Sequence, residues 1–336
     1  MNALVPLVEL TRGGYVECTH FGAIAVVNAR GNVLAQAGDA DFVTFTRSTL
    51  KAFQALPFVE AGGVQRFGFS TPEVAMLCAS HNGEAKHVAA VESMLGKSGQ
   101  TYQRLRCGCG VPGLYSLMDK SAPEGLQFDE RHHNCSGKHA GFVAHCIGQG
   151  WSVDDYTDPA HPLQQAVAKD VARAVGMDVS DMKMGIDGCS APNFAMPLSK
   201  LAYGYARLAS GTRDAEFGAS FALLGEAMSS HPDMVSGTGR NDAAFMQAGR
   251  GDWVTKIGAD GVQVIGSKSR GEALAIKISD GNKTALYAAA VETLDQLGWL
   301  DDAQRAQLAP WRASDILSAR GASVGQRRTA FQLQAV

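Results

Sequence analysis

The chain has 336 residues, of which 46% are hydrophobic and 19% charged. This balance is typical of a folded globular protein and argues against a disordered one. A net charge of −3 gives no electrostatic sign of a nucleic-acid or acidic-membrane partner. The apolar runs are far shorter than the roughly 20 residues that a membrane-spanning helix needs, and the first residues do not show the pattern of a secretion signal. We therefore expect a cytoplasmic enzyme.

Seven cysteines are present, an odd number. In a reducing cytosol they would be free thiols, metal ligands or buried fillers rather than a disulfide framework. They are Cys18, Cys78, Cys107, Cys109, Cys135, Cys146 and Cys189. Spacing alone assigns no role to the pair Cys107 and Cys109.

The first part of the chain alternates between polar and apolar residues. Residues 4–38 therefore predict an antiparallel meander of three or four strands joined by glycine-containing turns. Residues 48–61 predict a helix that Pro57 kinks or ends. Residues 101–135 have little periodicity. Further helices are predicted at 72–79, 84–96, 137–148, 161–175, 196–209 and 213–229.

Strand patterns return beyond Gly251. The segments WVTKIG, VQVIGS and EALAIKIS alternate, and a helix at 284–298 and a strand at 325–332 follow. Strands at both ends with helices between them predict an α+β fold. We expect a single catalytic domain, 1–336, in which residues 1–46 and 251–336 share one antiparallel sheet. The mainly helical region 47–250 would carry most of the active site.

Ser48 and Lys51 are the first candidate pair. Positions i and i+3 share one face of a helix, and a serine becomes a nucleophile only when a base removes its proton. Arg47 and the apolar flanks would favour a neutral lysine amine. The alternative is that Ser48 caps a helix and Lys51 is solvated, which the spacing alone does not exclude. Further along, Ser80 lies in a polar cluster that is either a plain loop or part of a cleft.

Two cysteine-containing stretches indicate a ligand or metal site. The stretch RHHNCSGKHAG places Cys135 and Lys138 at the start of a helix among several histidines. The stretch GIDGCSAPN places Cys189 in a tight turn beside Asp187. Together Cys135 and Cys189 would make half of a zinc site, although their separation fits no standard zinc finger. Lys256 lies on a predicted strand, where it either faces a cleft or is exposed.

Six stretches, in this order, resemble the L-asparaginases of the Rhizobium etli type, also called asparaginase II or class 3. They are RSTLKAFQALPFVE, ASHNGE, HHNCSGKHAGF, GIDGCSAPNFAMPL, HPDMVSGTGR and KIGADGV. The resemblance implies hydrolysis of L-asparagine to L-aspartate and ammonia. It also implies a fold like that of serine β-lactamases and penicillin-binding proteins, and a homodimer.

The resemblance also assigns roles to residues. It implies two Ser-Lys pairs, Ser48 with Lys51 and Ser80 with Lys256, either serine being the nucleophile. It implies a zinc ion held by Cys135, Lys138 and Cys189 that orients the substrate. Arg47, His139 and Asp187 would contact the substrate. Two departures are visible: Thr49 stands where a smaller residue is common, and Asp242 stands where some relatives have a cysteine, so no third thiol is expected near the site.

Two other functions remain open from the sequence. A serine acyl hydrolase of β-lactamase or glutaminase type would use S-x-x-K, S-x-N and K-x-G, which occur in that order at 48–51, 80–82 and 256–258. Against it, Ser80 follows Ser48 closely, and the two cysteine stretches have no counterpart in such enzymes. A non-catalytic protein that binds zinc or an amino acid would keep the cysteines and use the serines only structurally.

Overall fold

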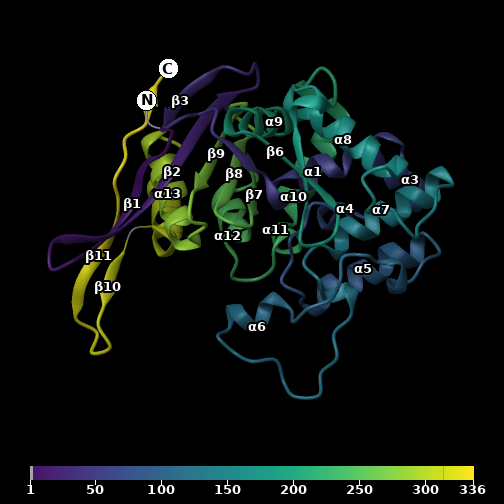
Figure 1. Cartoon of the computed structure of the whole chain (residues 1–336), viewed down its shortest axis with the longest axis horizontal. Coiled ribbons are helices and arrows are strands. Elements are labelled where there is room, and N and C mark those ends of the chain that lie inside the picture. Colours follow the sequence, from purple (N-terminus) through teal and green to yellow (C-terminus); the bar gives the residue numbers. More distant parts are fainter. Residues whose placement is uncertain (1–2, 313) are drawn as a thin grey trace. The chain divides into compact units, whose positions relative to one another are not determined.

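The computed structural model describes residues 3–312 and 314–336, and the chain divides into two compact units (Figure 1). Unit 1 comprises Met1–Thr49, Met196–Ser210 and Ala248–Val336. Unit 2 comprises Leu50–Ala195 and Gly211–Gln247. The two units are described separately below. The expectation of a single catalytic domain stays a prediction.

Unit 1 is built on an antiparallel sheet that strands from both ends of the chain share. Its order is β10 (Asp315–Leu317), β11 (Ser323–Thr329), β1 (Val5–Arg12), β2 (Tyr15–Asn28), β9 (Glu272–Ile278), β8 (Val262–Ser267) and β7 (Trp253–Gly258). In addition, β3 (Val33–Ala37) pairs with β2, and β12 (Gln334–Ala335) pairs with β3. The predicted α+β class, with terminal strands in one sheet and a helical region inserted between them, is confirmed.

Strand β2 joins two of the predicted strands into one of 14 residues. Its first part pairs with β1, and its second part, from Gly22 onward, pairs with β9. A Cβ atom on Gly22 would lie 2.1 Å from the Lys277 carbonyl oxygen. Because glycine has no Cβ atom, β2 can approach β9 closely here and continue as one strand. The sequence pattern instead predicts the end of a strand at this point.

Helices α9 (Leu198–Ser210) and α13 (Lys283–Gln296) pack against this sheet. A Cβ atom on Gly266 of β8 would lie 2.8 Å from the Tyr205 carbonyl oxygen, so α9 approaches the strand closely. Strands β7 and β8 are buried along their whole length, so their polar side chains Thr255, Lys256, Gln263 and Ser267 are buried together with the apolar ones. The remaining elements are β4 (Val43–Phe45), α14 (Asp302–Leu308) and η6 (Ala309–Trp311), and the short turn η1 (Arg47–Leu50) begins in this unit.

Unit 2 is mainly helical. Its elements are α1 (Lys51–Gln54), α2 (Leu56–Glu60), α3 (Gly63–Phe67), α4 (Thr71–Leu77), α5 (Ala85–Lys97), η2 (Tyr102–Arg104), α6 (Gly113–Leu117), η3 (Glu130–His132), α7 (Ser136–Gln149), α8 (Pro162–Val175), η4 (Val179–Asp181), β5 (Lys183–Ile186), β6 (Pro192–Pro197), η5 (Gly211–Arg213), α10 (Gly218–Ser230), α11 (Pro232–Val235) and α12 (Asn241–Ala248). Strands β5 and β6 form an antiparallel hairpin.

The helix predicted over 48–61 is interrupted. It begins as the 3₁₀ turn η1, continues as α1, breaks at Ala55 and restarts as α2 with Pro57 in its first turn. Proline fits that place because the first turn of a helix leaves backbone N–H groups unpaired in any case. The helix predicted from 213 begins only at Gly218, since residues 211–213 form the 3₁₀ turn η5.

Two glycines bring the start of α7 against α4. A Cβ atom on Gly137 would lie 2.3 Å from the Met76 carbonyl oxygen, and one on Gly141 would lie 2.4 Å from a Leu77 methyl group. Because these glycines are four residues apart, they share one face of α7. This contact brings the residues around Asn134 close to the end of α4, where the chain continues to Ser80.

Candidate active site

In unit 1, a strained turn presents Ser48. Arg47 begins η1 with a backbone φ of 51°, which is unusual for a residue other than glycine. Its guanidinium pairs with Asp260, in the turn after β7. Ser48 is half-buried. A Cβ atom on Gly258 would lie 2.8 Å from the Thr46 carbonyl oxygen, so β7 passes close to this turn.

Lys256 lies on β7 in the same unit and is fully buried. Its Nζ donates a 2.9 Å hydrogen bond to the Ile257 carbonyl oxygen. A lysine on a strand is more often exposed, and this burial favours a specific role for the amine.

In unit 2, Lys51 and Ser80 contact each other in a buried environment. The Lys51 Nζ donates a 2.8 Å hydrogen bond to the Ser80 hydroxyl oxygen, and it also donates to the carbonyl oxygens of Ala79 and Asn134. Lys51 is 1% exposed and Ser80 is 4% exposed. The amine is therefore held in one place by acceptors from the segments that follow α4 and precede α7.

Cys135, Lys138 and Cys189 form a second buried cluster in unit 2. The Lys138 Nζ lies 3.1 Å from the Cys189 sulfur, and the two thiols are close enough to shift each other's pKa. The neighbouring Cys189 and burial raise the pKa of Cys135. The neighbouring Cys135 and the Lys138 ammonium lower the pKa of Cys189. Burial acts to lower the pKa of Lys138, but the two cysteines outweigh it and raise that pKa.

Asp187 and His139 flank this cluster. Asp187 is half-buried and opens the turn between β5 and β6, where its carboxylate accepts a 2.8 Å hydrogen bond from the Gly188 N–H. His139 Nδ1 lies 2.8 Å from the Tyr156 hydroxyl, and the ring also interacts with the Cys189 thiol. Burial lowers the pKa of His139 to about 4, so its imidazole is neutral at pH 7.

The structure adds a residue that the sequence did not assign. Cys107 is buried, its thiol lies 3.6 Å from the Glu130 carbonyl oxygen, and it is close enough to Cys189 to interact electrostatically. Burial, with a contribution from Cys189, raises the pKa of Cys107 to about 12. The expectation of no third thiol near the site is therefore wrong. Only the C-x-C spacing could have drawn attention to Cys107.

The candidate residues thus fall into two groups. Unit 2 brings together Lys51 with Ser80, and Cys135 with Lys138, Cys189 and His139. Unit 1 contributes Arg47, Ser48 and Lys256, whose contacts within that unit are given above. Among the described residues, no three His, Cys, Asp or Glu side chains gather in a way that could hold a metal ion, so any metal in this cluster would need Lys138 as a ligand.

The sequence model of one protein family, described as L-asparaginase II, matches residues 8–329. The chain belongs to the L-asparaginase II family. As an L-asparaginase II protein it is an amidohydrolase of the asparaginase type, and its substrate is a small molecule. The predicted family and enzyme class are confirmed, which also removes the non-catalytic alternative.

Other comparisons add little about the activity of this L-asparaginase II protein. The search of curated proteins found no match. Among solved structures, the chain is similar to a β-lactamase from Mycobacterium bovis, with 15% identity, a TM-score of 0.40 and coverage of 82% of this chain and 94% of that one. A protein from Bacteroides dorei, also described as a β-lactamase, gives 13% identity, a TM-score of 0.44 and coverage of 82% and 93%.

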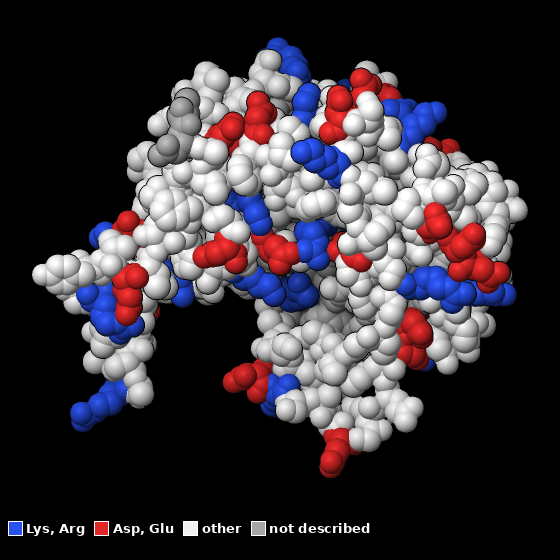
Figure 2. All heavy atoms as spheres, in the orientation of Figure 1, with Lys and Arg blue, Asp and Glu red and all other residues white. Residues whose placement is uncertain are grey.

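In the part of the chain that the structure describes, none of the helices has the length and apolar character needed to cross a bilayer. Basic and acidic side chains are interspersed on the face drawn in Figure 2. The cytoplasmic location stays a prediction.

Proposed function

We propose that the protein hydrolyses L-asparagine to L-aspartate and ammonia through a serine nucleophile served by lysine. The observation that supports this most directly is the buried Lys51, whose Nζ lies 2.8 Å from the Ser80 hydroxyl oxygen. A lysine amine held beside a serine hydroxyl is the arrangement that proton transfer during acyl transfer requires.

Ser48 is the proposed nucleophile. It is half-buried and therefore open to a substrate, whereas Ser80 is buried. Lys51 would remove the Ser48 proton as the Ser48 oxygen attacks the side-chain carboxamide carbon. The C–N bond would break, and the same proton, passed on by Lys51 and Ser80, would leave with the nitrogen as ammonia. Water would then hydrolyse the ester and release aspartate and the free serine. Lys256 would serve as a second amine in this proton transfer.

Cys135, Lys138 and Cys189 would hold a zinc ion. Two sulfurs and one amine fit zinc, and three protein ligands leave one position open. The 3.1 Å contact between Lys138 Nζ and the Cys189 sulfur supports this set of ligands. When bound, the ion would supply positive charge that orients the substrate. Asp187 beside this cluster would hold the substrate amine, and His139 and Arg47 would complete the contacts.

An ammonia-release assay tests this function. Purified protein should release ammonia from L-asparagine, and Ser48→Ala should abolish the release while folding normally. Brief incubation with substrate followed by acid quench and peptide mass spectrometry should locate the acyl group on the Ser48 peptide. An acyl group on the Ser80 peptide would reverse the assignment of the two serines. Rapid turnover of nitrocefin without ammonia release would instead indicate a β-lactamase.

We also propose that the protein is a homodimer, as the family resemblance implies. Exposed apolar side chains on β2 are consistent with a partner surface: Tyr15 is 83% exposed and Phe21 is 43% exposed. Light scattering at several protein concentrations would measure the mass directly, and a monomer throughout would exclude the dimer.

A further inference from the structure

A cavity of about 330 Å³ lies in unit 2 directly beside the Lys51–Ser80 pair. Its lining includes His81, which follows Ser80 in the chain, and Asn134, whose carbonyl oxygen accepts a hydrogen bond from Lys51. Cys109 and Arg240 also line it. The cavity is large enough for one amino acid, and its position would bring a bound molecule next to the reacting groups.

Arg240 is the permanent charge of this cavity. The lining residues include no aspartate or glutamate, and among the described residues no carboxylate pairs with the Arg240 guanidinium. Arg240 is half-buried. A guanidinium stays protonated at any physiological pH and matches a carboxylate with two parallel hydrogen bonds. A half-buried arginine without an acidic partner is therefore available for an anionic ligand.

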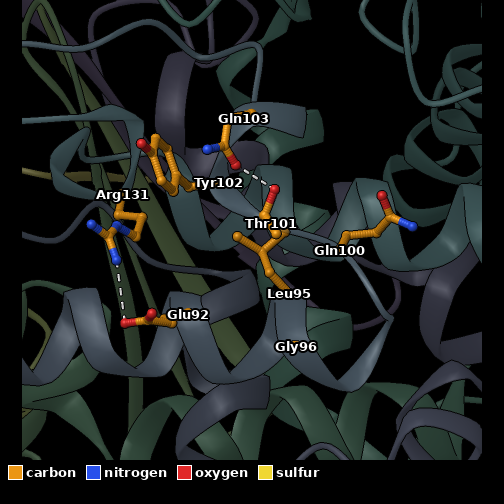
Figure 3. Close-up of a pocket in the computed structure, with 8 residues that line it drawn as sticks. All are labelled: Glu92, Leu95, Gly96, Gln100, Thr101, Tyr102, Gln103 and Arg131. Carbon is orange, nitrogen blue, oxygen red and sulfur yellow. Dashed lines mark hydrogen bonds and ion pairs between the residues drawn. The ribbon is translucent and has the colours of Figure 1, made fainter.

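A second cavity of the same unit shows the contrast. It also measures about 330 Å³ and is lined by Arg131 (Figure 3). There the arginine is already neutralised: it pairs with Asp129 at 2.6 Å and with Glu92 at 3.2 Å, and it lies over the Tyr102 ring. The two cavities are equal in size, but only the one beside Ser80 keeps its arginine unpaired.

The segment that carries Arg240 is fixed to the segment that carries Ser80. The Ser80 N–H donates a 2.8 Å hydrogen bond to the Val235 carbonyl oxygen, and the Thr238 N–H donates a 2.9 Å hydrogen bond to the Glu84 carboxylate. Between these bonds, a Cβ atom on Gly237 would lie 2.2 Å from the Asn82 side-chain oxygen. This contact leaves no room for any other residue at 237. The backbone at Arg240 is thus tied to that of Ser80, whose hydroxyl Lys51 contacts.

We propose that Arg240 binds the α-carboxylate of the amino-acid substrate and so selects amides of amino acids over simple amides. This inference rests on the proposed asparaginase function, because asparagine carries one anionic group and its side-chain amide must reach the Lys51–Ser80 pair, which delivers the proton to the leaving nitrogen. The carboxylate would accept hydrogen bonds from the guanidinium at one end of the cavity. The amide nitrogen would lie toward Ser80 and Lys51, which deliver its proton, at the other end.

Kinetics on two substrates test the proposal. 3-Aminopropanamide keeps the amine and the amide of asparagine but lacks the carboxylate. We expect Arg240→Gln to lower kcat/KM for asparagine by about 10- to 100-fold, mainly through a higher KM. The variant should leave inhibition or turnover by 3-aminopropanamide within about twofold of wild type. Arg240→Lys should restore part of the loss, and Arg104→Gln, which removes an exposed arginine of the same unit, serves as the matched control.

Cysteine alkylation gives a readout that does not depend on activity. Cys109 lines the same cavity and is exposed, whereas the exposed Cys18 lies on β2 of unit 1. L-Aspartate should slow alkylation of Cys109 by iodoacetamide in the wild type but not in Arg240→Gln. Alkylation of Cys18, followed by peptide mass spectrometry in the same sample, should not change.

The outcomes separate the two proposals. If the wild type releases no ammonia from asparagine and aspartate does not slow alkylation of Cys109, the proposed asparaginase function and this inference are both wrong. The wild type could be active while Arg240→Gln reduces the turnover or binding of asparagine and of 3-aminopropanamide by the same factor. Arg240 would then act only structurally, and the inference would be overturned. Equal protection of Cys109 in wild type and variant would overturn it as well.

Discussion

Lys51 and Ser80 are joined by a 2.8 Å hydrogen bond between two buried side chains. The sequence placed Lys51 with Ser48 and Ser80 with Lys256, because chain spacing and family resemblance suggested those pairs. The structure shows that the hydroxyl partner of Lys51 is Ser80, 29 residues further along the chain. The buried Lys51 amine is therefore positioned to exchange a proton with the Ser80 hydroxyl.

Removing the Lys51 amine should slow catalysis strongly. We expect Lys51→Met to lower kcat by about 10²- to 10⁴-fold, the usual contribution of a general base, because the Ser80 hydroxyl then loses its nitrogen partner. The measurement is ammonia release, with thermal unfolding to confirm the fold. Lys169→Met, which changes an exposed lysine on α8, is the matched control and should retain full activity. A Lys51→Met enzyme with unchanged kcat would contradict the proton-transfer role.

Zinc affinity should rise with pH. The pKa of Lys138 and the pKa of Cys135 are both raised, so both groups carry protons near pH 7 and must lose them to bind a metal. The pKa of Cys189 is lowered, so it binds without releasing a proton. Two released protons predict roughly a 100-fold tighter zinc complex per pH unit. Competition with a zinc-binding dye at pH 6, 7 and 8 measures the slope.

The variant Lys138→Met removes one of these protons and one ligand. This variant should bind zinc more weakly, and its zinc affinity should rise by only about tenfold per pH unit. Cys18→Ser alters an exposed cysteine on β2 and should change neither value. Zinc binding that does not vary between pH 6 and 8 would exclude this set of ligands.

Gly137→Ala should destabilise the protein. The new Cβ atom would lie 2.3 Å from the Met76 carbonyl oxygen, so α4 and α7 would have to separate. We expect a loss of about 1–3 kcal/mol in the free energy of unfolding, measured by urea denaturation. Gly96→Ala is the matched control, because its Cβ atom would meet nothing within 4 Å on α5. That variant should gain about 0.5–1 kcal/mol from helix propensity. Equal effects of the two substitutions would contradict the close helix contact.

Glu84 should make stability depend on acid pH. Burial acts to raise its pKa, but hydrogen bonds from Asn82, Thr238 and Lys86 outweigh it and lower the pKa to about 2. Because the folded-state pKa lies below the unfolded value, this stabilisation is present above about pH 4.5 and is lost as the pH falls toward 2. Glu84→Gln should therefore cost roughly 2 kcal/mol at pH 7 and much less at pH 3. Urea denaturation at the two pH values measures the difference, and a cost that does not vary with pH would contradict it.

Local sequence patterns predicted much of the secondary structure. Helices α5, α7, α8 and α13 and strands β7, β8 and β9 lie within two residues of the ranges expected from periodicity. Patterns failed where the determining contact is distant in the chain. The break expected near Gly22 is absent because β9, about 250 residues away, accepts a continuous strand. The short helices between 101 and 135 have too few turns to show a period.

The sequence by itself determined the family, because six ordered motifs carry that information without any geometry. It also determined which side chains are chemically able to act: Ser48, Lys51, Cys135 and Cys189 are reactive or metal-binding residue types. Only the tertiary structure decided that Lys51 contacts Ser80 and that Cys107 lies near Cys189. It also decided that Arg240 lines a cavity and has no carboxylate partner among the described residues. Each of these depends on packing between segments far apart in the chain, such as α4 against α7, and spacing along a sequence does not encode such distances.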